Sequence, residues 1–547
     1  MPASRRKAAR SSDSNDSGYA EVNSIEEFLA RKDKYRVVDP GPPLAYPIYK
    51  TSPETVLRGL IEKLKPEVVQ LLSSFEITAS DLLLRLWHAY PGDQVTANVF
   101  HVVTTDTNPA VWQAAAKSLV SLFFNNGAAA LDLEHPFQVE ISNPDISYHD
   151  ISRCLPNDPP LLELFNRKKD AITEIVSTEL PSLISAISFH NRIPHSKRLT
   201  ECVGKHTVMI YCRPGIPANF SSVEERLIDL FQDATADIHI EFLPGVVWNS
   251  ILPDLGAPQY LPDIPRKPVN GSSISTEGGI NAGSLGGWVY LNLPNSPPLM
   301  CMLTCYHVVR AINPAITSVT DRDGVTLEND TGHVDVVYPA EIDKSLTIEK
   351  FEQDRLAGKG EMLKEFEDTW AEILQKRSIG RVLCASGYRL SGRSRVDWAL
   401  VDASETFTAN RPPSRSNFSP NHKKPNPVAL WGPNEDFQAR EFGNLREGDW
   451  VAFRGRGSGV VSGEVNTIRS RIFWPVPNLT SDEWEVLPLG DGSFTLPGDS
   501  GSMVFNSKGQ IVGLNMAKVG EAGYITTVET IQKDVKELTG GFLSLEN

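Results

Sequence analysis

The chain has 547 residues, of which 40% are hydrophobic and 22% are charged, a composition that is ordinary for a folded protein of two to four domains. Its formal net charge of −15 argues against a general binder of nucleic acid or of acidic membranes, because attraction to phosphate needs a basic surface. The six cysteines form no C-x-x-C pair and no zinc-like spacing, so we expect reduced thiols, no metal site and no cofactor.

Residues 1–23 are predicted to be a disordered tail that is rich in Ser, Arg and Asp. The tail has no apolar core of about seven residues, and the whole chain has no apolar window of about 18, so we expect neither a secretory signal nor a transmembrane helix. An intracellular protein, cytoplasmic or nuclear, is the expectation. The basic residues Arg5, Arg6, Lys7 and Arg10 are either part of a solvated tail or a nuclear-localisation signal.

Residues 24–253 are predicted to form an α/β or α+β region, in one or two units. Ser24-Ile25-Glu26-Glu27 has the form of a capping box that begins a short helix. Apolar side chains at helical spacing predict helical core faces over residues 67–87, with a break near Thr78. Further helices are expected at 110–124, 161–177 and 222–234, and extended segments at 97–104, 137–141, 183–189, 206–212 and 238–242. The histidines of this region lack the i, i+4 spacing of metal ligands.

A stretch rich in Pro, Gly, Ser and Asn predicts a linker at residues 254–282. From residue 283 to 547 the sequence pattern changes to short runs that favour β-strands, separated by residues typical of turns. A helical insertion is expected within this part, at 343–378, where apolar residues recur at helical spacing amid many charges. These apolar residues are Met362, Leu363, Phe366, Trp370, Ile373 and Leu374. The insertion either packs against the neighbouring sheet, covers a site as a lid, or docks a partner.

The sequence Pro497-Gly498-Asp499-Ser500-Gly501 can place a serine hydroxyl on a sharp turn. Glycine permits backbone conformations that side chains disfavour, so the amides of Gly498 and Ser500 can point at one spot and hold an oxyanion. The alternative is an ordinary turn, in which the hydroxyl only caps the backbone. A serine nucleophile needs a base within hydrogen-bond reach and a group that orients the base.

Two upstream segments supply candidates for these groups. The apolar run that includes Thr304-Cys305-Tyr306-His307 ends with His307, a candidate base, whereas the alternative is a core histidine satisfied by the backbone. Val396-Asp397-Trp398-Ala399-Leu400 places Asp397, a candidate orienting acid, at the start of an apolar strand. One alternative is that Asp397 only caps the strand. The other is that the nearby Asp402 is the orienting acid.

These three blocks, in the order His, Asp, Ser, resemble the motif blocks of trypsin/chymotrypsin-like serine proteases. Residues 448–465 resemble the hairpin that opens the second barrel of that family, and residues 509–528 resemble the strands that wall its specificity pocket. The resemblance covers roughly residues 283–547 and implies an all-β double Greek-key barrel with the site in the cleft between barrels. It also implies a serine endopeptidase that acts on polypeptide through His307, Asp397 and Ser500, with Gly498 and Ser500 as the oxyanion hole.

The sequence departs from the family pattern in two respects. No Ile-Val-Gly-Gly start occurs near residue 281, so we expect Asp499 to be satisfied without the new amino terminus that activating cleavage supplies in secreted members. The position six before Ser500 is Phe494 instead of an acid, which predicts an uncharged side chain before the scissile bond. The expected pocket residues are Phe494, Met516, Ala517, Lys518 and Gly523. A preference for acidic residues through Lys518 is the competing expectation.

Two alternatives come from other classes of function. One is a catalytically silent protease relative that binds peptide, and the other is a scaffold whose N-terminal half carries the function. A protein partner is possible for the N-terminal region or for the helical insertion.

Overall fold

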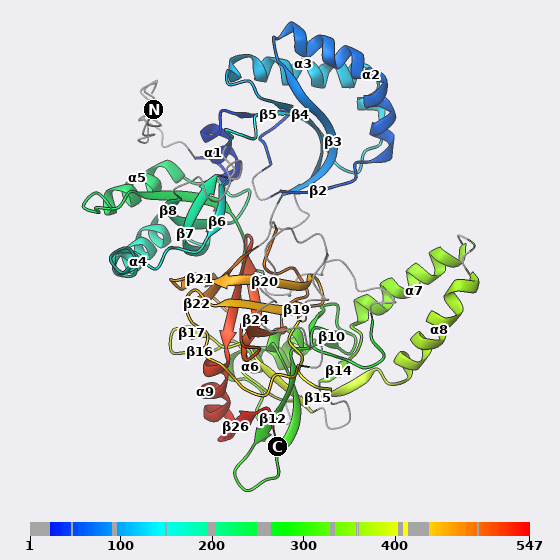
Figure 1. The fold of residues 1–547 in the computed structure, drawn as a ribbon, viewed down its shortest axis with the longest axis vertical. Coiled ribbons are helices and arrows are strands. Elements are labelled where there is room, and N and C mark those ends of the chain that lie inside the picture. The colour runs from blue at the N-terminus through cyan, green and yellow to red at the C-terminus, as the bar shows by residue number, and fades with distance from the viewer. Residues whose placement is uncertain are drawn as a thin grey trace.

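The computed structural model describes residues 22–44, 48–89, 96–147, 150–194, 204–248, 264–328, 334–356, 358, 360–402, 408–413, 437–489 and 492–546. The predicted tail up to residue 21, including the basic run at Arg5, and residues 254–263 of the predicted linker lie outside these ranges. Figure 1 shows a sheet with helices at the top and a second unit with helices below it. The largely β part at the bottom consists of the described residues from 264 to 546 and is called the body below.

The first unit is a five-stranded sheet in the order β1-β5-β4-β3-β2. Its elements are β1 (Arg36–Asp39), β2 (Ile48–Thr51), α2 (Thr55–Ser74), β3 (Ala79–Ala89), β4 (Thr96–Thr104), α3 (Trp112–Asn125) and β5 (Phe137–Ser142). Helices α2 and α3 bury one apolar face each, and Val68 and Leu119 are among the side chains that meet the sheet in one core cluster.

The prediction of a helical core face over residues 67–87 is wrong in its second half. Helix α2 ends at Ser74, and residues 79–89 form strand β3, which pairs antiparallel with β4 from Ala79↔Thr104 to His88↔Thr96. Leu82, Leu83 and Leu86 are only partly buried in this strand. Leucines at positions that fit a helix can also lie on a strand, so the apolar pattern alone did not separate the two structures.

The second unit consists of β6 (Asp150–Arg153), α4 (Pro159–Glu179), β7 (Ile184–Pro194), β8 (Lys205–Cys212), α5 (Phe220–Leu230) and β9 (Ile238–Pro244). Helix α1 (Ile25–Lys32) packs here, because its Phe28 contacts Phe220 and Phe242. The predicted capping box of α1 is confirmed: Ser24 Oγ accepts from the Glu27 amide at 3.3 Å, and the Ser24 amide donates to Glu27 Oε2 at 3.0 Å.

The body contains two large sheets. An eight-stranded sheet has the order β11-β10-β14-β15-β18-β13-β12-β26. Its strands are β10 (Ser273–Thr276), β11 (Gly283–Ser284), β12 (Gly287–Asn292), β13 (Leu299–Thr304), β14 (Asp335–Val337), β15 (Ser378–Ala385), β18 (Ala399–Asp402) and β26 (Phe542–Ser544). Strand β10 is fully buried and pairs with β11 and β14, so residues 273–276 of the predicted linker are part of this sheet.

The second large sheet joins the body to the second unit. It runs β20-β19-β23-β24-β25-β22-β21-β7-β8-β9. Its C-terminal strands are β19 (Trp450–Gly455), β20 (Gly459–Val465), β21 (Ser470–Trp474), β22 (Leu479–Pro488), β23 (Met503–Asn506), β24 (Ile511–Val519) and β25 (Ala522–Thr527), followed by helix α9 (Val528–Thr539). The junction is an antiparallel pairing of β21 with β7, at Arg471↔Ile187 and Ile472↔Ala186.

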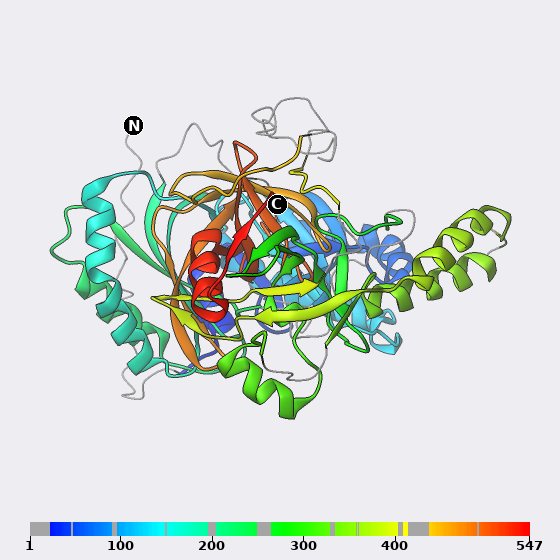
Figure 2. The ribbon, with the colours of Figure 1, turned by 90° about the horizontal axis from the view of Figure 1, so that it is seen from below.

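Smaller elements complete the body. They are α6 (Pro314–Asp323), α7 (Glu341–Leu356), α8 (Gly360–Gln375), β16 (Leu390–Ser391) and β17 (Ser394–Arg395). Helices α7 and α8 occupy the predicted insertion and extend away from the body in both views (Figures 1 and 2). The side chains of Trp370 and Ile373 are buried in the main core cluster. Among the described residues, no helix combines the length and the apolar character that crossing a membrane requires.

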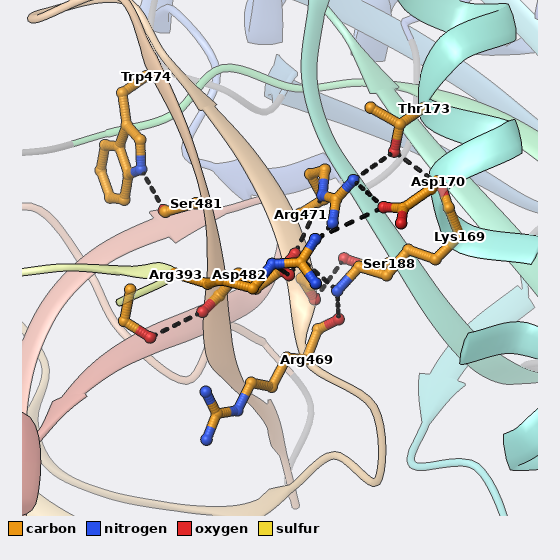
Figure 3. A network of polar contacts seen from close by, with 12 residues as sticks. Lys169, Asp170, Thr173, Ser188, Arg393, Arg469, Arg471, Trp474, Ser481 and Asp482 are labelled. Carbon is orange, nitrogen blue, oxygen red and sulfur yellow. Dashed lines mark hydrogen bonds and ion pairs between the residues drawn. The ribbon is translucent and has the colours of Figure 1, made fainter. Parts of the chain in front are cut away.

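Charged side chains connect α4 to the β21–β22 hairpin beside this junction (Figure 3). Asp482 forms an ion pair with Lys169 at 2.7 Å and accepts from Arg471 at 3.0 and 3.1 Å. Arg471 also donates to Asp170 of α4 at 2.7 Å. Burial alone would raise the pKa of Asp482, but the Arg471 hydrogen bonds and the Lys169 charge lower it. The second unit and the body therefore share both a sheet and a buried charge network.

We predict that Asp482→Ala lowers the free energy of unfolding by about 3 kcal/mol, because the buried Lys169 loses its counter-charge and Arg471 keeps only the exposed Asp170. Chemical denaturation followed by circular dichroism measures this loss. As a control, Lys350→Ala removes an exposed ion pair with Asp354 and should cost no more than about 0.5 kcal/mol. Equal effects of the two substitutions would contradict a stabilising role of the network.

Candidate active site

His307 and Asp397 meet at one end of the eight-stranded sheet. Strand β13 ends at Thr304, and His307 follows in a single 3-10 turn, Tyr306–Val308. Asp397 lies just before β18, which pairs with β13 so that Ala399 is opposite Thr304. The ladder therefore brings two residues that are far apart in sequence to the same edge.

The two side chains form a buried hydrogen-bonded pair. His307 Nδ1 lies 2.7 Å from Asp397 Oδ2, and the His307 amide donates to Asp397 Oδ1 at 3.1 Å. Both residues are at most 2% exposed. Burial alone would raise the pKa of Asp397, but the charge and hydrogen bond of His307 outweigh it and lower the pKa. An ionised Asp397 can hold the imidazole in the tautomer that leaves Nε2 as a base.

Arg395 and Glu483 surround this pair and were not predicted from the sequence. The Arg395 guanidinium lies 4.0 Å from the Trp474 ring centroid and 4.2 Å from that of Tyr388, and one nitrogen is 3.4 Å from Asp397 Oδ2. The Arg395 amide donates to Glu483 Oε1 at 2.7 Å. Burial raises the pKa of Glu483 to about 8. The only sequence signal for Arg395 was its place two residues before Asp397, and Glu483 gave none.

Ser500 lies on a turn between β22 and β23 that requires two glycines. Gly498 has φ +91° and Gly501 has φ +92°, which disfavour a side chain. A Cβ atom on Gly501 would lie 2.2 Å from Thr304 Oγ1 and 3.2 Å from the Cys305 amide nitrogen. The serine turn thus packs directly against the end of β13, two to three residues before His307.

Ser284 fixes the same turn from the other side. Its amide donates to the Ser500 carbonyl at 2.8 Å, and its hydroxyl donates to the Gly498 carbonyl at 2.8 Å. The Arg456 amide in turn donates to Ser284 Oγ at 2.9 Å. With both carbonyls occupied, the backbone conformation around Ser500 is held by contacts from strand β11 and from the end of β19.

Asp499 is satisfied by backbone amides. Its Oδ1 accepts from Gly457 at 2.7 Å and from Ser458 at 2.9 Å, and its Oδ2 accepts from Leu496 at 2.7 Å. Burial raises the pKa of Asp499, and these hydrogen bonds oppose the rise. The expectation that Asp499 needs no new amino terminus as its partner agrees with these contacts.

The Ser500 hydroxyl donates to the Met516 carbonyl at 3.3 Å. His307 Nε2 is buried and has no hydrogen-bond partner among the described residues. The expected hydrogen bond between Ser500 and His307 is therefore absent in this conformation. Catalytic hydrogen bonds often form only in the substrate complex, so this geometry does not exclude Ser500 as a nucleophile.

The predicted pocket residues lie on or beside β24 and β25. Phe494 is fully buried in a core cluster and packs edge-on against Phe453 at 5.1 Å. Its ring fills the space beside Gly523, where a Cβ atom would approach to 2.5 Å. Met516, Ala517 and Lys518 are buried along β24. Burial lowers the pKa of Lys518 to about 7, although the charge of Glu521 opposes this.

One group of described residues has the composition of a metal site. Ligand atoms of Cys305, His307 and Asp397 lie within 4.8 Å of one another. Burial raises the pKa of the Cys305 thiol well above its ordinary value, and His307 Nδ1 is engaged by Asp397. A metal needs a thiolate and an available imidazole nitrogen, so this environment favours the His–Asp hydrogen bond over a metal.

No model of a known protein family matches the sequence, and no curated protein sequence matches it. Comparison with solved structures finds chymotrypsin-like serine proteases over about half of the chain. Thermobifida fusca protease A is 12% identical and covers 50% of this chain and 97% of its own, with a TM-score of 0.28. Cellulomonas bogoriensis chymotrypsin is 13% identical and covers 51% of this chain and 98% of its own, with a TM-score of 0.27.

A glutamic acid-specific serine protease is also similar, at 11% identity and a TM-score of 0.25. Identities and TM-scores this low assign neither activity nor residue roles, which we infer from the contacts within this chain.

We predict that Glu483 makes the stability of the protein depend on pH. Its folded pKa of about 8 lies above the ordinary 4.5, so its contribution is complete below about pH 4.5 and is lost as the pH rises towards 8. Glu483→Gln keeps the acceptor for Arg395 but cannot ionise. Its free energy of unfolding relative to the natural protein should therefore increase from pH 5 to pH 8, by at most about 1.4 kcal/mol per pH unit.

Denaturation curves over this pH range measure the effect. The matched control is Glu352→Gln on the exposed face of α7, which should leave the pH dependence unchanged. Parallel curves for Glu483→Gln and the natural protein would contradict the raised pKa.

Proposed function

We propose that this protein is a serine peptidase that cleaves peptide bonds in polypeptide substrates. The observation that carries the proposal is the buried His307–Asp397 pair beside the glycine-flanked turn of Ser500. We also propose that the two large sheets of the body correspond to the two Greek-key barrels that the sequence resemblance implies, with the site between them.

In the proposed reaction, Ser500 Oγ attacks the carbonyl carbon of the scissile peptide bond while His307 Nε2 takes the hydroxyl proton. Asp397 Oδ2 stabilises the resulting imidazolium. The amides of Gly498 and Ser500 donate to the tetrahedral oxyanion. The C–N bond then breaks, His307 returns the proton to the leaving amine, and water hydrolyses the Ser500 ester. Ser500 must first turn from the Met516 carbonyl towards His307.

The environment of the proposed pocket favours an uncharged side chain before the scissile bond. Phe494 stands at the position where an acid would bind Lys or Arg, and its side chain lies among apolar side chains. Burial disfavours the charged form of Lys518, and the charge of Glu521 acts on the same group. Lys518 is therefore a poor partner for an acidic substrate residue.

One observation favours a catalytically silent peptide-binding protein instead. The Ser500 hydroxyl is hydrogen-bonded to Met516 and not to His307. If the turn of Ser500 held this conformation permanently, the hydroxyl would never be activated.

A fluorophosphonate probe separates the two functions, because it reacts only with an activated serine. We predict that the purified protein becomes labelled, and that Ser500→Ala abolishes the labelling. Ser502→Ala, two residues further along the chain and just before β23, is the matched control and should remain labelled. A folded natural protein that stays unlabelled would support the silent peptide binder.

We predict that Asp397→Asn lowers kcat for an uncharged peptide substrate by about 10³–10⁴-fold, because the imidazole loses the carboxylate that sets its tautomer. Steady-state hydrolysis of an alanine-peptide aminomethylcoumarin amide measures the change. A substitution of the neighbouring Asp402 to Asn should have little effect, since Asp402 is exposed at the end of β18. A similar loss in both variants would contradict the role of Asp397.

A further inference from the structure

The edge of β24 that faces Ser500 changes its partner part-way along the strand. Strand β23 pairs with β24 up to Leu514, and the Asn515 amide still donates to the Ser502 carbonyl at 2.9 Å. The Asn515 carbonyl accepts from the Gly501 amide at 2.8 Å, and the carbonyl after it, that of Met516, accepts from the Ser500 hydroxyl. The part of the β24 edge that lies beyond the end of β23 can therefore pair with another extended polypeptide, because the backbone groups of an unpaired strand edge bind an added strand.

Trp248 of the N-terminal region pairs with this edge at Lys518. The Trp248 amide donates to the Lys518 carbonyl at 3.0 Å, and the Lys518 amide donates to the Trp248 carbonyl at 3.1 Å, in an antiparallel bridge. This is the hydrogen-bonding pattern of one residue of an added antiparallel strand. The indole N–H of Trp248 is buried without an acceptor among the described residues, so backbone pairing provides its polar contacts with β24.

The segment that carries Trp248 is held firmly against the body. Strand β9 ends at Pro244, and a Cβ atom on Gly245 would lie 2.8 Å from the Tyr211 ring and 3.2 Å from Val519. Val247 is 9% exposed and belongs to the main core cluster together with Tyr211 and Val519. A wedge of N-terminal residues is therefore packed along the last residues of β24.

The register relates Trp248 to the position of the chemistry. Met516 and Lys518 are two residues apart, at a point where the pairing of β24 with β25 shifts register between Asn515 and Ala517, and both present backbone groups to this edge. A polypeptide bound antiparallel in the register of Trp248 would place one residue opposite Lys518. The residue two positions further towards its carboxyl end would lie opposite Met516, beside the Ser500 hydroxyl.

We propose that Trp248 is a specificity-determining residue that closes this edge and limits the acyl side of the substrate to about two residues. Trp248 occupies the place of the substrate residue two before the one whose carbonyl is attacked. Longer acyl chains have to displace it. The substrates are then polypeptides that are cleaved about two residues from their amino terminus. The N-terminal region of the protein sets this distance. The inference rests on the proposed peptidase function.

The test compares two substrates that differ only in acyl length, Ala-Ala-aminomethylcoumarin and acetyl-Ala-Ala-Ala-Ala-aminomethylcoumarin. In the natural protein the dipeptide should have the higher kcat/KM. Trp248→Pro removes the amide donor, and the ratio of kcat/KM for the longer substrate to that for the shorter one should rise about tenfold, the worth of one or two ladder hydrogen bonds. Trp248→Phe keeps the backbone pairing and should keep the natural ratio.

An unchanged ratio in Trp248→Pro, or a ratio that falls, would overturn the proposal. Trp248→Gly, which weakens the pairing without removing the amide, gives the same comparison if the proline variant does not fold.

In a Ser500→Ala background, fluorescence anisotropy of a labelled tetra-alanine peptide reports binding without catalysis, and Trp248→Pro should tighten this binding about tenfold. Equal binding overturns the proposal. A natural protein that neither hydrolyses these peptides nor reacts with the phosphonate refutes the peptidase function, and the binding comparison still decides the role of Trp248.

Discussion

A carboxylate buried away from water has to be compensated by hydrogen bonds, and the compensation of Asp397 fixes the geometry on which the candidate site depends. His307 supplies it with both its ring and its amide, while Arg395 adds a nearby positive charge. Arg395 is in turn packed between two aromatic rings and bonded through its amide to Glu483. The imidazole is thereby oriented by layers of buried contacts from both large sheets.

The serine turn is fixed by contacts of the same kind from other elements. Ser284 bonds to the carbonyls on both sides of Asp499, and the Asp499 carboxyl accepts from the turn that follows β19. These contacts come from β11 and from the 456–458 turn, which belong to different sheets. Because both large sheets contact the turn, a displacement of one sheet against the other would change the position of Ser500.

The N-terminal region is structurally continuous with the site. Strand β7 extends the sheet that contains β24, the Lys169–Asp482 network links α4 to β22, and the segment after β9 reaches the edge of β24 at Lys518. The second unit is thus part of the framework around the proposed pocket.

Much of the candidate site could be predicted from the sequence, because each motif block combines a reactive residue with local turn or strand signals. Glycines flanking Ser500 and the apolar runs beside His307 and Asp397 are local features. The contacts of Glu483, Ser284 and Trp248 could not be predicted, since they depend on pairings between strands far apart in the chain. The sequence predicts helix where the structure has strand β3 for a related reason: the leucines of β3 fit both periods, and only the pairing with β4 separates the two structures.

The most direct test is a crystal structure of the protein after reaction with a peptidyl phosphonate. We predict one covalent bond to Ser500 Oγ, a phosphonate oxygen within about 3 Å of the Gly498 and Ser500 amides, and His307 Nε2 within hydrogen-bond reach of the Ser500 oxygen. A phosphonate attached to another residue, or a His307 ring turned away from a modified Ser500, would contradict the proposed site.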